Sequence, residues 1–282
     1  MKILILGGQG LVGSMLVSYL SRTTYHALTY TARQPIQHPM GRQLDVRNTA
    51  LLQQLFQELQ PEVVINCLEL LPAHPNWSME YAIYLNSLFP HCLLRWADHY
   101  QFRLIHISTA SVFDGAMGDY HEMATPNNTS PYGRSKSLGE FSHPLHVVIR
   151  TSFIGPERKN QGHGLLSWFL AQEGSIYGHE HVRGNCVTTL ELAKMISWLL
   201  NKPLGGMIHL GGRRKISHYE LLCNLQATFQ RTQVKIEALA EPYEDLTLVS
   251  TRGDFDYYVT PYERMFEELK HWIMEQDKEG FQ

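Results

Sequence analysis

Several features that would place a protein in a special class are missing from this sequence. Its four cysteines lie far apart and form no C-x-x-C pair, so we expect buried thiols in a reducing compartment rather than disulfides. No apolar run approaches the roughly 20 residues of a membrane span, and no Lys/Arg run accompanies the net charge of -3. The N-terminus also lacks the layout of a secretory signal. We therefore expect a cytoplasmic protein with neither a membrane nor a nucleic-acid partner.

Metal-binding patterns are equally scarce. His179 and His181 form an i,i+2 pair, but this is not the spacing of a zinc site, and no third ligand lies near them in the sequence. His163 is also isolated. Surface or substrate-loop histidines explain these positions better than ligands do, so we predict no metal site.

What the sequence does contain is a regular alternation of short apolar runs and amphipathic segments over its first 150 residues. Runs such as Ile3–Leu6, Val63–Cys67 and His146–Ile149 are typical of strands that are buried on both faces of a parallel sheet. The alternation predicts an α/β fold with a doubly wound parallel sheet of the Rossmann type. A smaller C-terminal lobe is expected to follow it.

The length of 282 residues allows one large domain and a smaller companion. We predict that residues 1–150, completed by about 187–212, form the nucleotide-binding domain. Residues 151–186 and 213–282 would form the smaller, substrate-binding lobe. The stretch from Gly155 to Gly164 is rich in glycine, charge and turn-forming residues, which predicts a mobile loop over the site.

A glycine-rich loop follows the first apolar run. Gly7, Gly10 and Gly13 form a G-x-x-G-x-x-G pattern between a predicted strand and a predicted helix. Such a loop lets backbone amides approach a pyrophosphate, which the helix N-terminus also attracts. We therefore expect the cofactor to contact the three glycines together with Leu11 and Val12.

The residues after the next strands indicate which dinucleotide this is. Where an acidic residue would bind the ribose hydroxyls of NAD, the sequence has Thr31 and Arg33. A guanidinium suits a 2′-phosphate, so we predict NADP, with NAD as the alternative. Further cofactor contacts are expected at the ends of the following strands, from Asp45, Val46, Asn66 and Cys67.

A candidate for acid–base chemistry lies at Tyr132 and Lys136. Their i,i+4 spacing places both side chains on one face of a helix. The ordinary pKa of a phenol is about 10, and a neighbouring ammonium would lower it toward a usable range. The Y-x-x-x-K spacing is common by chance, so its weight depends on the motifs upstream.

Those motifs resemble the extended short-chain dehydrogenase/reductases, and among them the dTDP-4-dehydrorhamnose reductases and related nucleotide-sugar 4-keto reductases. The resemblance is carried by the glycine loop, by Ser108-Thr109 with Val112-Phe113-Asp114-Gly115, and by Tyr132 to Lys136 with Gly139-Glu140. It implies a triad in which Tyr132 protonates the ketone oxygen as hydride arrives from the nicotinamide. Thr109 would hydrogen-bond the same oxygen, and Lys136 would lower the phenol pKa and bind the ribose.

The resemblance also implies a substrate site. We expect Ser108, Ser111 and Arg150 to face the substrate, with a buried ion pair as the alternative role of Arg150. A homodimer through two core helices is consistent with the family.

Two departures from the family pattern concern the substrate pocket. Ala110 and Ser111 stand where these reductases usually have Asp-Tyr, so a proton-relay pair is missing. The stretch Asn66 to Glu69 replaces a small, alanine-rich turn. We therefore expect another nucleotide sugar than the rhamnose precursor.

The resulting hypothesis is an NADP-preferring reductase of the 4-keto group of a nucleotide-activated deoxysugar, in a pathway of polysaccharide biosynthesis. Two alternatives stay open. One is a nucleotide-sugar epimerase or dehydratase, although a dehydratase would need an acid–base pair just after Thr109. The other is a catalytically silent, NADP-binding regulatory subunit, since relatives of the family serve methionine adenosyltransferase in that way.

Overall fold

The computed structural model describes residues 1–157 and 164–278. Most of the loop that the sequence predicts between Gly155 and Gly164, including His163, therefore lies outside the described residues. No helix in the described part of the chain is long and apolar enough to span a membrane.

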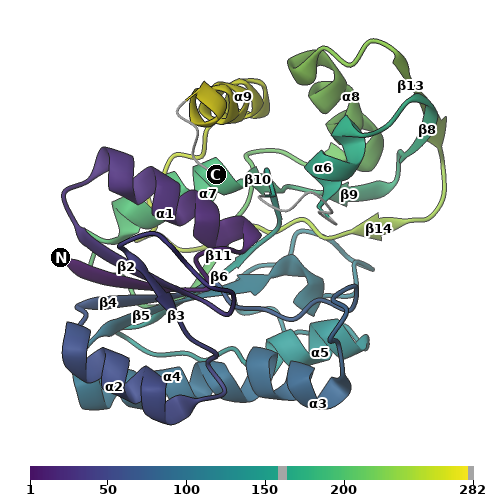
Figure 1. The fold of residues 1–282 in the computed structure, drawn as a ribbon. Coiled ribbons are helices and arrows are strands. Elements are labelled where there is room, and N and C mark those ends of the chain that lie inside the picture. The colour runs from purple at the N-terminus through teal and green to yellow at the C-terminus, as the bar shows by residue number, and fades with distance from the viewer. Residues whose placement is uncertain (158–163, 279–282) are drawn as a thin grey trace.

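A seven-stranded sheet lies at the centre of the molecule (Figure 1), with the strand order β11-β6-β5-β4-β1-β2-β3. Every pairing in it is parallel. The strand order reverses between β1 and β4, and ligands of such sheets bind at the carboxyl ends of the strands beside that reversal. The predicted doubly wound α/β fold is thus confirmed. The strands are β1 (Lys2–Leu6), β2 (Ala27–Ala32), β3 (Gly41–Gln43), β4 (Val63–Asn66), β5 (Arg103–Thr109), β6 (Val147–Thr151) and β11 (Gly206–Leu210).

Two layers of helices cover the two faces of the sheet (Figure 1). Successive side chains of a strand point to opposite faces, so Ile3 and Ile5 join one hydrophobic core while Leu4 and Leu6 join the other. This two-sided burial explains why positions 3–6 of the strand are all apolar. One layer holds α1 (Leu11–Thr23), α7 (Thr189–Leu199) and α9 (Tyr262–Lys278). The other holds α2 (Thr49–Leu59), α3 (Met79–Ala82), the π-helical turn η1 (Ile83–Leu88), α4 (Phe89–Tyr100) and α5 (Pro131–Ser137).

A smaller group of elements gathers beyond the carboxyl ends of the strands, at the upper right of Figure 1. Its strands form small sheets, in which β13 pairs with β8, and β9 lies between β12 and β14. The short strands β7 (Phe153–Ile154) and β10 (Val187–Thr188) pair with each other near the central sheet. The elements of the group are α6 (Leu165–Leu170), β8 (Gly174–His179), β9 (Val182–Gly184), β12 (Ile216–Ser217), α8 (His218–Phe229), β13 (Val234–Leu239) and β14 (Glu244–Asp245).

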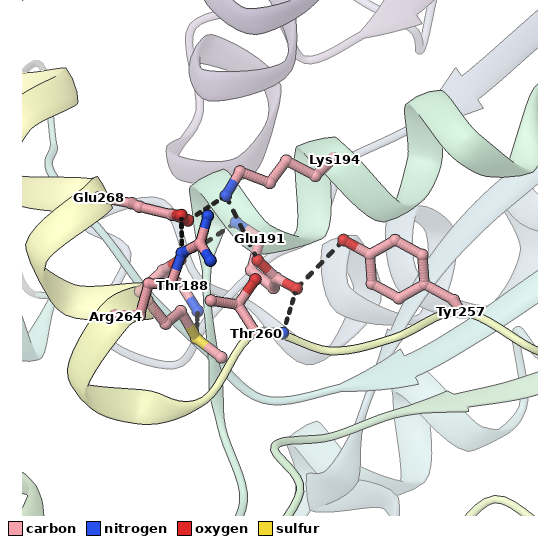
Figure 2. A network of polar contacts seen from close by, with 8 residues as sticks. Thr188, Glu191, Lys194, Tyr257, Thr260, Arg264 and Glu268 are labelled. Carbon is pink, nitrogen blue, oxygen red and sulfur yellow. Dashed lines mark hydrogen bonds and ion pairs between the residues drawn. The ribbon is translucent and has the colours of Figure 1, made fainter.

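A buried carboxylate joins α7 to α9 and to the segment before α9 (Figure 2). Glu191 is fully buried and accepts hydrogen bonds from the Tyr257 hydroxyl (3.1 Å) and from the backbone N–H of Thr260 (2.8 Å). Lys194 lies 3.7 Å from Glu191 and also pairs with Glu268 of α9. Because a buried charge must be paired and hydrogen-bonded to be tolerated, this network stabilises the packing of the C-terminal helix α9 on α7.

Candidate active site

The glycine loop after β1 has the geometry that its sequence predicts. Gly7 has φ +83°, a conformation that favours glycine. A Cβ on Gly13 would lie 2.2 Å from the carbonyl oxygen of Gly7, so no side chain fits there. Gly10 is the N-cap residue of α1 and no side chain caps it. The loop therefore leaves the first N–H groups of α1 without a side-chain cap, and such N–H groups can bind a pyrophosphate. Leu11 and Val12, also predicted to contact a cofactor, form the first positions of this helix.

Thr31 lies beneath this loop. Its side chain is buried, its hydroxyl oxygen accepts a hydrogen bond from the N–H of Gly7 (3.3 Å), and its carbonyl accepts one from Gly8 (2.9 Å). Its position therefore indicates that Thr31 supports the loop, a task different from the ribose contact that the sequence suggested.

Two arginines lie beside the expected adenosine site. Arg33 is exposed and places one guanidinium nitrogen 3.1 Å from Nε2 of His74. Asp45 accepts hydrogen bonds from the Arg47 guanidinium (3.1 and 3.0 Å), so its carboxylate is already engaged. These hydrogen bonds are the main reason why the pKa of Asp45 is lowered, and the charge of Arg33 adds to the effect. Arg47, which the sequence analysis did not single out, therefore lies beside the expected adenosine site together with Arg33.

The last residue of β4, Asn66, is polar, but its side chain is buried and already hydrogen-bonded within the protein. Asn66 is fully buried, and its amide donates to Nδ1 of His106 (3.0 Å) and accepts from the N–H of Leu68 (3.2 Å). Val46 is also buried.

Desolvation, followed by the charge of Glu69, raises the pKa of the Cys67 thiol. Cys67 is therefore a thiol at neutral pH, and the structure gives it no feature of an activated nucleophile.

Tyr132 occupies the first turn of α5, whose N-terminus is capped by Ser130 through the N–H of Gly133 (3.1 Å). Its hydroxyl donates a hydrogen bond to Oε2 of Glu69 (2.9 Å). Burial, the charge of Glu69 and this hydrogen bond raise the pKa of Tyr132 well above its ordinary value, while a hydrogen bond with Thr109 acts in the opposite direction. The structure thus brings Tyr132 and Thr109 together, and it adds a carboxylate to them.

The ammonium of Lys136 binds a backbone carbonyl, whereas the sequence analysis expected it to act on the Tyr132 phenol. Its ammonium is buried and donates to the carbonyl oxygen of Ile107 in β5 (2.9 Å). Burial lowers the pKa of Lys136, and the charge of Glu69 is the largest influence that raises it again. The expected lowering of the phenol pKa is wrong for this arrangement, because burial and then the neighbouring Glu69 carboxyl group raise the pKa of Tyr132.

The three residues expected to face a substrate lie in different settings. Ser108 donates to Oε1 of Glu140 (2.7 Å), and the guanidinium of Arg150 makes two hydrogen bonds to the same carboxylate (2.9 and 2.7 Å). Arg150 is buried and also contacts Nε2 of His209 (3.3 Å). The ion pair that was the alternative for Arg150 is therefore present. Ser111 is half-buried and donates its N–H to the Thr109 hydroxyl (3.1 Å).

One group of described side chains has the spacing of a metal site, formed by Asp98, His143 and His146. In both rings Nδ1 accepts a backbone N–H, from Leu145 in His143 (3.2 Å) and from Leu104 in His146 (3.1 Å). A neutral ring of this kind carries its proton on Nε2, which therefore offers no lone pair to a cation. These hydrogen bonds argue against a metal.

The sequence and the fold were compared with known proteins. The family model described as "RmlD substrate binding domain" matches residues 1–245. The Probable low-salt glycan biosynthesis reductase Agl14 of Haloferax volcanii is 32% identical over 158 residues, which cover 53% of this chain and 52% of that protein. The match thus spans about half the length of that relative.

Two further proteins are similar over more of the chain. Methionine adenosyltransferase 2 subunit beta of Xenopus tropicalis is 29% identical over 245 residues, which cover 81% of this chain and 72% of the relative. The crystal structure of dTDP-4-dehydrorhamnose reductase from Bacillus anthracis in complex with NADP superposes with a TM-score of 0.80 at 18% identity, and covers 96% of this chain and 99% of that one. At this identity the superposition establishes the fold alone.

Proposed function

We propose that this chain, which belongs to the RmlD substrate binding domain family, is an NADP-preferring reductase of the 4-keto group of a nucleotide-activated deoxysugar. The observation that carries the proposal is the convergence of Tyr132 and Thr109, from α5 and from the end of β5, on the edge of the sheet where the glycine loop lies. A phenol and a hydroxyl placed together can both hydrogen-bond one carbonyl oxygen.

In this mechanism the bound nicotinamide supplies the hydride. Tyr132 gives its proton to the ketone oxygen, and Thr109 holds that oxygen in register by a hydrogen bond. Lys136, which is fixed by the Ile107 carbonyl, would bind the ribose.

The preference for NADP rests on positive charge near the expected ribose. Arg33 and Arg47 both influence the carboxylate of Asp45, and Arg33 is exposed and able to pair with a 2′-phosphate. The glycine loop would hold the pyrophosphate, and Asn66 and Cys67, at the end of β4, would support the floor of the site. The solved relative from Bacillus anthracis contains NADP, which supports the same choice.

We also propose that two parts of the chain bind different molecules. Residues 1–150 with 187–212 would bind the cofactor, and 151–186 with 213–282 would bind the nucleotide sugar. A cytoplasmic enzyme of glycan biosynthesis, acting as a homodimer, fits the family.

A second function is favoured by one observation. The similarity to the beta subunit of methionine adenosyltransferase 2 covers 81% of the chain, more than the 53% covered by the similarity to the archaeal reductase. A regulatory subunit that binds NADP without turnover is therefore the second candidate. An epimerase or dehydratase is less well supported, because the residues after Thr109 are a buried alanine and a serine.

The test combines cofactor binding with turnover. NADPH and NADH are titrated by fluorescence, and NADPH oxidation is then followed with a panel of 4-keto nucleotide sugars. We expect tighter binding of NADPH and turnover of at least one sugar. Tyr132→Phe should keep NADPH binding and lose about a hundredfold to ten-thousandfold in turnover.

The other outcomes separate the candidates. NADPH binding without turnover of any sugar would favour the regulatory subunit. Reductase activity that survives in Tyr132→Phe would contradict the mechanism. The absence of binding of either cofactor would contradict both functions.

A further inference from the structure

The loop after β4 presents a carboxylate to the candidate acid, Tyr132. Glu69 is half-buried and lies in the loop after β4, whereas Thr109 ends β5, and its carboxylate accepts the phenol hydrogen bond at 2.9 Å. It lies 63 positions before Tyr132 in the chain. The turn that carries it is the one that departs from the small, alanine-rich turn of the family.

Two buried amides fix this loop on either side of Glu69. The side chain of Asn66 accepts the N–H of Leu68 (3.2 Å), and the side chain of Asn86 pairs with both the N–H (2.8 Å) and the carbonyl (3.1 Å) of Leu70. Both asparagines are fully buried. Satisfied buried polar groups specify one arrangement, so the position of the carboxylate is set before any ligand binds.

The same amide also fixes the loop to the helix that carries the phenol. Asn86 donates to the Ser135 hydroxyl (3.0 Å), and the neighbouring Ser87 hydroxyl donates to the Ser135 carbonyl (2.7 Å). Asn86 lies in the π-helical turn η1, a type of irregularity that is frequent at functional sites. Glu69 and Tyr132 are thus held relative to each other through a shared anchor.

The charged and titratable groups around the pair are few. The charges of Glu69 and Glu140 act on Lys136, and Lys136 in turn acts on the buried His106. The ammonium of Lys136 is engaged by the Ile107 carbonyl. In direct contact with the phenol, therefore, are the Glu69 carboxylate and the Thr109 hydroxyl.

We propose that Glu69 is a positioning residue that decides when Tyr132 can release its proton to the substrate. With Glu69 ionised, the phenol proton points at the carboxylate, as in the structure. With Glu69 protonated, the carboxyl group donates to the phenol oxygen and the phenol O–H is free to point at the ketone oxygen. This inference rests on the proposed reductase function.

The step balances in atoms and charge. A bound dihydronicotinamide would supply hydride to the carbonyl carbon and be oxidised, and the π pair of the C=O bond would move to oxygen as the ketone is reduced. The O–H bond of Tyr132 breaks and its proton goes to that oxygen. The O–H bond of Glu69 breaks and its proton goes to the phenolate, after which water reprotonates the carboxylate. Two adjacent anions never form, and Glu69, in the loop after β4, takes the place of the missing Asp-Tyr pair after Thr109.

The activity of the enzyme should fall as the pH rises. Reduction requires the protonated pair, so kcat should fall by about tenfold per pH unit above the apparent pKa of the pair. Glu69→Gln keeps the size of the side chain and its ability to hydrogen-bond but cannot titrate, so this decline should disappear. Glu58→Gln, at an exposed position of α2, is the matched control and should keep it.

A second readout needs no turnover. Ionisation of Tyr132 is measured by ultraviolet difference titration of each protein against its own Tyr132→Phe counterpart, which removes the signal of the other tyrosines. We expect the phenol to ionise at lower pH in Glu69→Gln than in the wild type, because the neighbouring anion is gone. Glu69→Asp, which keeps a carboxylate, should retain the decline of kcat with pH and covers the case that the glutamine variant does not fold.

The outcomes separate this inference from the proposed function. An unchanged phenol titration in Glu69→Gln overturns the inference, even if the wild type is an active reductase. The inference is also overturned if Glu69→Gln lowers kcat equally at every pH and the decline of kcat with pH remains. A residue with only a structural role would have that effect. A shifted titration in a protein that turns over no sugar upholds the coupling of Glu69 to Tyr132 and contradicts the proposed function.

Discussion

Arg150 and Glu140 form a buried, two-point ion pair, with hydrogen bonds of 2.9 and 2.7 Å between the guanidinium and the carboxylate. The guanidinium also lies over the ring of Phe113, 5.0 Å from its centroid. The pair joins β6, the end of β5 through Ser108, and the segment after α5. It therefore fixes the frame from which Thr109 and Tyr132 extend.

Removing one partner of this pair should be strongly destabilising. Glu140→Gln leaves the guanidinium of Arg150 buried without its counter-charge, so we expect the free energy of unfolding to fall by about 3 kcal/mol. Urea unfolding followed by circular dichroism measures it. Glu237→Gln, which removes the carboxylate of the surface pair with Lys235, should leave the transition nearly unchanged. If Glu140→Gln lowered the free energy of unfolding as little as Glu237→Gln does, the structural role of the Arg150–Glu140 ion pair would be contradicted.

The fold could be predicted from the sequence because its signals are local. The fully apolar run from Ile3 to Leu6 and the glycines at 7, 10 and 13 determine a buried strand and its turn, whatever lies elsewhere in the chain. The i,i+4 spacing of Tyr132 and Lys136 likewise places both on α5.

The directions of the polar side chains could not be predicted in this way, because they depend on contacts between distant segments. Lys136 turns to a carbonyl 29 positions earlier, and Tyr132 meets a carboxylate 63 positions earlier. The sequence did indicate that the turn at Glu69 departs from the family pattern. It could not indicate that the carboxylate would reach the phenol.

The glycine loop permits a sharp test of the cofactor site. In Gly13→Ala the new methyl group would lie 2.2 Å from the Gly7 carbonyl, and backbone cannot move aside without opening the loop. We expect the Kd for NADPH to rise by at least about tenfold, measured by fluorescence titration. Gly253→Ala is the control, because a methyl group there meets nothing within 4 Å. Equal affinity in the two variants would place the cofactor elsewhere.

The choice between the two dinucleotides should depend on Arg33. Arg33→Ala removes the exposed guanidinium, and a lost charge-assisted hydrogen bond corresponds to a rise of roughly tenfold to a hundredfold in the Kd for NADPH. The Kd for NADH should stay the same, because NADH has no 2′-phosphate. Arg42→Ala removes an exposed guanidinium that contacts only neighbouring backbone carbonyls in the hydrogen bonds described, and it should change neither Kd. If Arg33→Ala raised the Kd for NADPH and for NADH equally, the arginine would contact a group that both dinucleotides contain, and not the 2′-phosphate.

His209 should make the protein sensitive to acid. Burial, and then the charge of Arg150, lower the pKa of His209 to about 4. Its Nδ1 lies 3.0 Å from the Tyr120 carbonyl and its Nε2 lies 3.3 Å from the Arg150 guanidinium, so a second ring proton would face a cation. The unfolded chain binds this proton near the ordinary pKa of about 6.5, and the folded protein binds it only near 4.

The stabilisation from a neutral His209 is therefore complete above pH about 6.5 and is lost as the pH falls toward 4, by up to about 3 kcal/mol in the free energy of unfolding. Urea unfolding at a series of pH values measures this slope. His209→Gln can donate to the Tyr120 carbonyl and accept from Arg150 but does not titrate, so it should flatten the slope between pH 6.5 and 4. His99→Gln, at an exposed position, should not. A slope that persists in His209→Gln would assign the acid sensitivity to other groups.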